Sequence, residues 1–148
     1  MSKDLGPTSE GETGIIVVFV FYDRNNNSVL LERRKKPGDF FDNKIIYPGG
    51  SVEKSELENF ENAFGREVKE ELEVIPLIYS RIPGTENLYG ESGMLIIPFL
   101  VSSWSGPVPI KVQDTESELV WLNLEAFVPE LDSVRRITEH VKAYVAQS

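Results

Sequence analysis

The sequence lacks cysteine and contains a single histidine, His140. It can therefore form no disulfide framework, no thiolate nucleophile and no thiolate metal site, and zinc sites built from several histidines are excluded. It also lacks an apolar run near the roughly 18 residues that a membrane-spanning helix needs, and its first residues lack the apolar stretch of a signal peptide. We expect a cytoplasmic protein with no membrane partner, in which any metal is held mainly by oxygen atoms.

Basic residues are also scarce. The chain of 148 residues has 15 Lys and Arg against 24 Asp and Glu, which gives a formal net charge of -9. Broad duplex-binding surfaces obtain their affinity from many Lys and Arg contacts to phosphate, so we expect no nucleic acid duplex as a partner. An acidic protein can still bind a small phosphate compound if cations mediate the contact.

The order of predicted elements indicates an α+β fold, a mixed sheet covered by helices. Residues 1–13 are polar and Gly-rich and are predicted to be a flexible N-terminal arm, followed by a single domain over 14–148. Buried, β-branched or alternating runs predict strands, and apolar positions at three and four residue steps predict a second helix. The predicted strands are 14–23, 29–35, 44–50, 74–82, 93–104 and 118–124, and the helices are 57 or 60 to 73 and 129–147.

The first helix carries an unusual concentration of glutamate. Glu67, Glu70 and Glu71 fall on one shoulder of it, beside the core stripe, where like charges at i, i+3 and i+4 repel each other. One interpretation is a solvated acidic surface; the other is a site for a hard divalent cation, which prefers carboxylate oxygens. Arg66 lies four residues before Glu70 and is predicted to pair with it. The predicted core stripe is Leu57, Phe64, Val68 and Leu72.

Two start signals compete for this helix. Ser55 with Glu58 has the spacing of a capping box, whereas Asn59 could cap a slightly later start. Upstream, Pro48 and the two glycines that follow are expected to stop a strand and form a turn that leads toward the helix, where backbone N–H groups can approach an anion.

The segment from Gly50 to Val74 resembles the signature of Nudix hydrolases, G-x5-E-x7-R-E-U-x-E-E-x-G-U, in which U is a bulky apolar residue. Two departures stand out. Glu58 has the E-x7-R spacing and Glu56 the G-x5-E spacing, so two extra residues are present; we favour Glu58, because an insertion in a loop costs little. Glu73 replaces the late glycine, so the exit turn of the helix is expected to differ. The positions that match in type are Gly50, Arg66, Glu67, Val68, Glu70, Glu71 and Val74.

The resemblance implies an α/β/α sandwich and a metal-dependent hydrolase of nucleoside diphosphates linked to another group. Glu67, Glu70, Glu71 and the carbonyl of Gly49 would hold Mg²⁺ or Mn²⁺, which binds the phosphates and activates a water for attack at phosphorus. Arg66 would hold a carboxylate in position. The predicted catalytic residues are Arg66, Glu67, Glu70 and Glu71, with Glu116 or Glu118 as a further glutamate, and the predicted substrate-binding residues are Arg34, Tyr47, Gly49 and Gly50.

The substrate is less sharply defined. The run "NKIIYPGG" (43–50) resembles the corresponding segment of MutT-like members of the family, which favours a nucleoside triphosphate, including an oxidised purine nucleotide, split into a nucleoside monophosphate and pyrophosphate. ADP-ribose and dinucleoside polyphosphates stay open, as do a non-catalytic nucleotide-binding module and a homodimer. Candidates for a purine slot are Phe40, Phe41, Tyr47, Tyr89 and Asp132.

Overall fold

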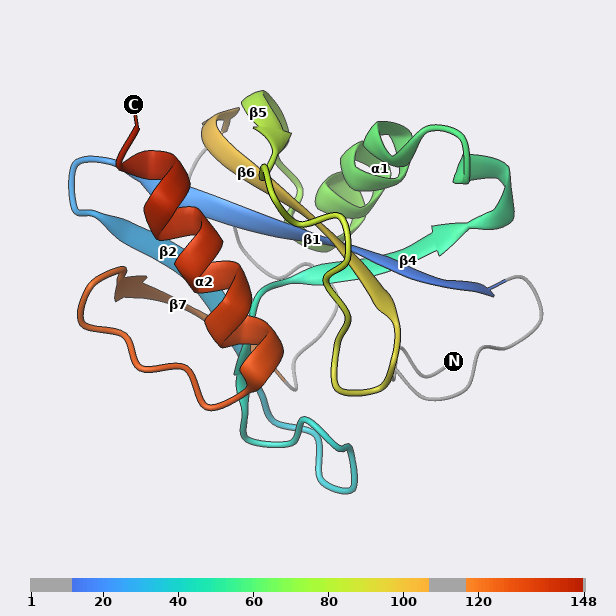
Figure 1. Cartoon of the computed structure of the whole chain (residues 1–148), viewed down its shortest axis with the longest axis horizontal. Helices are drawn as coiled ribbons and strands as arrows, with labels where there is room; N and C mark the ends of the chain where they lie inside the picture. The colour runs from blue at the N-terminus through green and yellow to red at the C-terminus, as the bar shows by residue number, and fades with distance from the viewer. Residues whose placement is uncertain (1–11, 107–116, 148) are drawn as a thin grey trace.

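The computed structural model describes residues 12–106 and 117–147. A seven-stranded mixed sheet is covered by two helices, which confirms the α+β class (Figure 1). The strands are β1 (Glu12–Asp23), β2 (Ser28–Arg34), β3 (Ile45–Ile46), β4 (Gly49–Glu53), β5 (Ile75–Arg81), β6 (Leu95–Ser105) and β7 (Ser117–Asn123). A short 3-10 helix, η1 (Lys54–Glu56), precedes α1 (Phe60–Leu72), and α2 (Asp132–Val145) is the last element in the described chain.

Strand β1 is the centre of the sheet. It pairs in parallel with β6 and antiparallel with β2 and β4, and β7 pairs with β2. Its side chains alternate between two buried clusters, as expected for a strand that is covered on both faces. Val18 and Val20 point to the face covered by α2, and Val17 and Phe19 point to the face covered by α1. In Figure 1, α2 crosses in front of the sheet.

Aromatic packing fixes α1 on its face of the sheet. The Phe64 ring stacks on Phe99 of β6 at a centroid distance of 4.3 Å and meets the edge of Phe19 at 6.1 Å. Val68 and Leu72 follow on the same side of the helix and are fully buried. This orientation turns the next side of α1, which carries the glutamates, toward β4.

Two predicted boundaries are wrong. Strand β1 begins at Glu12, and the Thr13 hydroxyl donates to the carbonyl of Val52 at 2.8 Å, so residues 12 and 13 belong to the sheet and not to an arm. The glycines after Pro48 do not end a strand with a turn; Gly49 begins β4, which pairs with β1. A Cβ on Gly49 would lie 2.2 Å from the carbonyl oxygen of Val17, so glycine permits this close approach.

Helix α1 begins at the later of the two predicted starts. The Asn59 side chain accepts a hydrogen bond from the backbone N–H of Asn62 at 3.2 Å, which is the N-cap contact. Leu57 therefore precedes the helix and is exposed, contrary to its predicted place in the core stripe. No helix within the described residues is long and apolar enough to span a membrane.

Candidate active site

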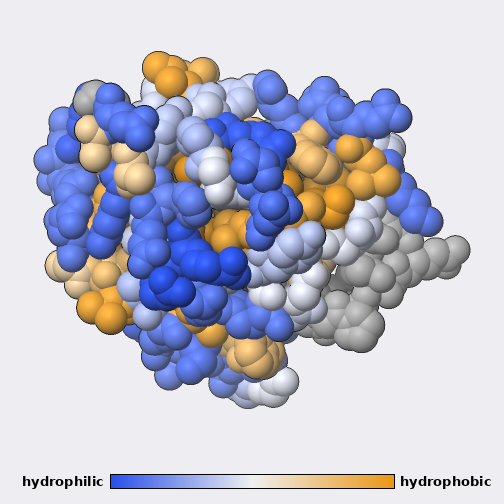
Figure 2. Space-filling view, in the orientation of Figure 1, coloured by the Kyte–Doolittle hydropathy of each residue, from blue (hydrophilic) through white to orange (hydrophobic). Residues whose placement is uncertain are grey.

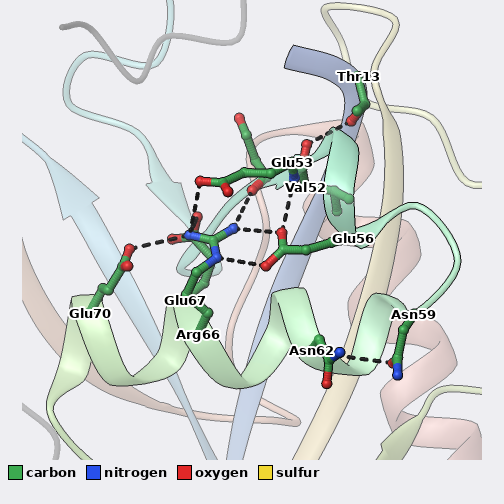
Figure 3. A network of polar contacts seen from close by, with 10 residues as sticks. Thr13, Val52, Glu53, Glu56, Asn59, Asn62, Arg66, Glu67 and Glu70 are labelled. Carbon is green, nitrogen blue, oxygen red and sulfur yellow. Dashed lines mark hydrogen bonds and ion pairs between the residues drawn. The ribbon is translucent and has the colours of Figure 1, made fainter. Parts of the chain in front are cut away.

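Arg66 is the centre of the acidic cluster. Its Nε and Nη2 donate to the two carboxylate oxygens of Glu56 at 2.7 and 2.8 Å, and Nη2 also donates to the carbonyl of Ser51 at 3.1 Å. This two-pronged contact matches the planar guanidinium to a carboxylate and gives it a defined orientation. Arg66 thus fixes the end of β4 and η1 to the middle of α1 (Figure 3).

The prediction that Glu58 occupies the first glutamate position of the signature is wrong. Glu58 is exposed, whereas Glu56 is 9% exposed and holds Arg66. Glu56 also accepts the backbone N–H of Glu53 at 2.9 Å and so closes the start of η1. The two extra residues lie between η1 and α1, where a loop absorbs them without rotating the side chains of the helix.

Glu67 and Gly50 form a close pair between α1 and β4. Glu67 is 1% exposed, and a Cβ built on Gly50 would lie 2.1 Å from its carboxylate. Only a glycine leaves room for that carboxylate against the strand. Arg66 Nη1 donates to Glu67 at 3.1 Å, which supplies the charged partner that a buried carboxylate requires.

The other two signature glutamates are nearer to solvent. Glu70 is 54% exposed at its side chain and accepts from Arg66 Nη1 at 3.3 Å, so the predicted i, i+4 pair is confirmed. Glu71 is half-buried. Arg66 Nη1 also lies 3.8 Å from the carboxylate of Glu53. Four carboxylates, those of Glu53, Glu56, Glu67 and Glu70, thus surround one guanidinium, and the cluster carries excess negative charge (Figure 3).

The contact between Glu56 and Arg66 shifts the pKa of both groups. The hydrogen bond from Arg66 lowers the pKa of Glu56 below its ordinary value, against the opposing effect of burial. The same hydrogen bond raises the pKa of Arg66, with further support from the charges of Glu67 and Glu53. Arg66 therefore stays charged while it orients Glu67 and Glu70.

Tyr47 belongs to a pocket on the opposite face of the sheet, which we call the α2 pocket. The Tyr47 ring is buried, its hydroxyl is within 2.7 Å of Thr138 Oγ1, and burial raises its pKa. The pocket has about 440 Å³ of empty space, part of it open to solvent, and it is mainly apolar. Apolar surface is visible at the centre of this face within a hydrophilic surround (Figure 2). The pocket is lined by Ile16, Val18, Phe41, Ile46, Tyr47, Gly90, Glu91, Ser92, Met94, Ile96, Ser133, Val134 and Ile137.

Of the other aromatic candidates for a purine slot, Phe41 lines this pocket and is buried. Phe40 is 68% exposed and meets the edge of Phe41 at a centroid distance of 4.9 Å. Tyr89 is 48% exposed and directly precedes the pocket residue Gly90. Asp132 begins α2 and forms ion pairs with Arg135 and Arg136.

The remaining predicted residues have partners of their own. Arg34 donates to Asp39 at 2.6 Å and lies 3.7 Å from Glu32. Glu118 is exposed on β7 and pairs with Lys35 at 3.1 Å. Glu116 lies outside the described residues. A substrate role for Arg34 and a catalytic role for Glu116 or Glu118 stay predictions.

Comparisons with known proteins decide the family. The family model described as NUDIX domain matches residues 13–143. The chain belongs to the Nudix family. It is 30% identical over 113 residues to the 8-oxo-dGTP diphosphatase of Escherichia coli (strain K12), an alignment that covers 75% of this chain and 86% of that protein.

Solved structures agree with the Nudix assignment. The MutT NUDIX hydrolase from Burkholderia pseudomallei has a TM-score of 0.63 and 25% identity, covering 84% of this chain and 96% of that one. The NUDIX domain of Shewanella oneidensis NrtR, solved with ADP ribose, has a TM-score of 0.66 and 17% identity, covering 88% and 87%. The chain is a MutT-like Nudix pyrophosphohydrolase with the α/β/α arrangement that the signature implied.

Nudix hydrolases generally use divalent cations such as Mg²⁺ or Mn²⁺, and the donor chemistry of this site fits them. The side chains of Glu56, Glu67 and Glu70, which contact Arg66, offer carboxylate oxygens, and these are the ligands that hard cations prefer. Within residues 12–106 and 117–147, no three acidic or histidine side chains already converge as a cation site. Glu67 and Glu70 nevertheless meet at a single nitrogen of Arg66, so these two carboxylates lie on the same side of α1.

Two contacts in the structure were not predicted from the sequence. The contact of Glu56 with Arg66 was signalled by the G-x5-E spacing from Gly50, which was given less weight than the spacing to Arg66. The second is the contact of Glu91, which lines the α2 pocket, with Ser133, whose N–H and hydroxyl both donate to its carboxylate. No motif marks Glu91, because the contact joins residues 42 positions apart.

Proposed function

We propose that the protein hydrolyses nucleoside triphosphates, with oxidised purine nucleotides among them, to a nucleoside monophosphate and pyrophosphate. The observation that carries the proposal is the packing of the Glu67 carboxylate against Gly50, with Arg66 joining Glu67 to Glu70. A purely structural helix has no reason to bury the Glu67 carboxylate beside a strand and to place three more carboxylates around Arg66, the arginine that pairs with it. The substrate class is supported by the relationship to an 8-oxo-dGTP diphosphatase.

In this proposal Glu67, Glu70, Glu71 and the carbonyl of Gly49 hold Mg²⁺ or Mn²⁺. The cation, when bound, neutralises phosphate oxygens and makes a water more acidic. Arg66 holds Glu67 and Glu70 on one side of α1, and Glu56 holds Arg66. Glu67 is fixed by burial, whereas Glu70 and Glu71 are open enough to solvent for one of them to accept the proton of the attacking water.

The test is hydrolysis of a panel of dNTPs, 8-oxo-dGTP, ADP-ribose and diadenosine polyphosphates with Mg²⁺ or Mn²⁺. We expect turnover of triphosphates with release of pyrophosphate. Glu70→Gln should lower kcat by at least about a hundredfold, because it removes a proposed cation ligand that is also one of the two candidates for the general base. The melting temperature without metal should stay nearly unchanged because Glu70 is exposed. Glu58→Gln is the matched control, since Glu58 is exposed just before the same helix.

Near wild-type turnover in the Glu70→Gln variant would contradict the role given to Glu70. Turnover confined to ADP-ribose would favour the second candidate substrate, which the ADP ribose complex of the Shewanella oneidensis domain keeps open. Binding of nucleotides with no turnover of any substrate would indicate a nucleotide-binding module.

A further inference from the structure

Exposed aliphatic side chains gather on one strand of the described chain. Ile75, Leu77 and Ile78 of β5 are between 58% and 62% exposed. Apolar surface is visible at the upper rim of the molecule in Figure 2, where Figure 1 places β5. Exposed apolar side chains that lie together, and not singly, indicate an interaction surface. The other large exposed apolar side chains lie on separate connecting segments and are Phe40, Leu57, Tyr89 and Val128.

Strand β5 is the outermost strand on its side of the sheet. It pairs with β6, and no other strand in the described part of the chain pairs with it (Figure 1). The Tyr79 ring lies 5.0 Å from the Phe64 ring of α1, and Ser80 Oγ lies 2.7 Å from the Tyr144 hydroxyl of α2. Because β5 is held from both faces of the sheet, its exposed side chains are presented by a fixed backbone, and docking on them costs little ordering.

The outer edge of β5 is not suited to a continuous β-ladder. Pro76 has no N–H to donate, and the register of β5 on β6 shifts between Pro76 and Ile78 and again between Ile78 and Tyr79. Proline and bulges on an edge strand oppose pairing with a further strand. The exposed side chains of β5 are therefore suited to packing against another apolar surface, and not to the addition of an extended peptide.

The two ends of β5 carry opposite charges. Glu73 directly precedes the last residue before the strand, Arg81 ends it, and both are exposed. Leu77 lies midway between them in the sequence. If a second copy of the chain lies antiparallel across Leu77, Glu73 of each copy faces Arg81 of the other, whereas a parallel arrangement brings like charges together. The antiparallel arrangement is two-fold symmetric and closed, so it stops at two chains.

We propose that the protein forms a reversible homodimer through β5, with Ile75, Leu77 and Ile78 packed at its centre and Glu73 paired with Arg81 at each end. Three aliphatic side chains make a small interface, so the dimer dissociates on dilution. Strands β6 and β1 lie between β5 and β4, which carries Gly50 of the acidic cluster. Dimerisation thus leaves the acidic cluster open, and the inference does not depend on the proposed function.

Sedimentation equilibrium of the full chain at increasing concentration tests the dimer. The mass of wild type should rise from that of one chain toward that of two. Leu77→Lys should raise the dissociation constant at least about tenfold, because it places a charge at the centre of the apolar contact. Val128→Lys is the matched control, since Val128 is an exposed aliphatic residue outside β5 and should associate as wild type does. A monomer at every concentration overturns the inference, as does a dimer that a folded Leu77→Lys variant leaves intact.

Charge reversal tests the antiparallel arrangement. Arg81→Glu should raise the dissociation constant at least about fivefold, because Glu73 then faces an acidic side chain at both ends of the interface. The double variant Glu73→Arg with Arg81→Glu restores opposite charges and should recover most of the wild-type affinity. Arg81 also lies 5.9 Å from the centroid of the Phe60 ring, so the melting temperature of each variant is measured to confirm folding. A folded double variant that associates no better than Arg81→Glu overturns the proposed pairing.

Discussion

At the residue scale, the site depends on how one arginine is shared among several carboxylates. The i, i+4 spacing of Arg66 and Glu70 was sufficient to predict their contact, since it depends only on helix geometry. The contact of Arg66 with Glu56 was not predicted, because it depends on where a loop places two extra residues. Distances along the chain fix neighbours within a helix, but they do not fix which loop residue reaches back to it.

The Glu56 contact makes a prediction about stability in acid. The pKa of the Glu56 carboxyl is lowered in the folded protein. The stability that its charged form contributes is therefore fully present above the pKa of an unfolded glutamate, about 4.3, and it is lost as the pH falls through the lower pKa of the folded protein. Glu56→Gln should therefore be less stable than wild type at pH 7, by about 1.5 to 3 kcal/mol for a lost charged hydrogen bond. Urea unfolding between pH 3 and pH 7 should show this gap closing as the solution becomes more acidic.

The exposed Glu58 provides the control for that measurement. Glu58→Gln should follow the wild-type curve at every pH, because Glu58 lies outside the Arg66 contacts. A gap between wild type and Glu56→Gln that keeps the same size down to pH 3 would show that Glu56 acts by packing and not by charge.

At the scale of the element, the two ends of α1 differ in how far the sequence predicted them. The cap at Asn59 was one of two predicted starts and is the one observed. The exit turn was expected to differ because Glu73 replaces glycine. Instead Glu73 adopts the left-handed conformation, with φ of 57° and ψ of 32°, and its N–H donates to the carbonyl of Lys69. This is the backbone conformation that glycine adopts most easily, so the helix ends in the expected way at the cost of strain.

Glu73→Gly should therefore stabilise the protein. A residue with a Cβ costs about 1 to 2 kcal/mol in the left-handed region. Glycine avoids this cost but increases the conformational entropy of the unfolded chain, which offsets part of the benefit. The net increase in the free energy of unfolding should be about 0.5 to 1 kcal/mol. Chemical denaturation measures the gain. Glu73→Gln removes the charge and keeps the Cβ, so it should show no comparable gain; an equal gain in both variants would assign the effect to charge.

At the scale of the whole molecule, the central sheet separates the acidic cluster around Arg66 from the α2 pocket. The mixed sheet and its helices followed from the order of apolar runs, because burial on both faces leaves a continuous β-branched and aromatic signal in β1. The α2 pocket did not follow, since its lining comes from segments far apart in the chain. Only the packing of α2 on the sheet brings those segments together.

The net charge of -9 gives a prediction at the same scale. A triphosphate is itself a polyanion, so the protein repels it unless cations lie between the two. A non-hydrolysable dGTP analogue with Mg²⁺ should raise the melting temperature, because it binds the folded protein. When the analogue concentration is a hundred times the dissociation constant, binding stabilises the folded state by about 2.7 kcal/mol. For a chain of this size that corresponds to a shift of about 5 to 10 °C.

With EDTA in place of Mg²⁺, the same analogue should produce little or no shift in a thermal unfolding experiment. Glu70→Gln should shift less than wild type with Mg²⁺, because one of the oxygens proposed to hold the cation is lost, whereas Glu58→Gln should shift as wild type does. An equal shift in EDTA would show that the phosphates are held by the chain's own Lys and Arg side chains, with no cation between the acidic cluster and the substrate. The negative charge around Arg66 would then have to be stabilised by the guanidinium alone, although four carboxylates surround it.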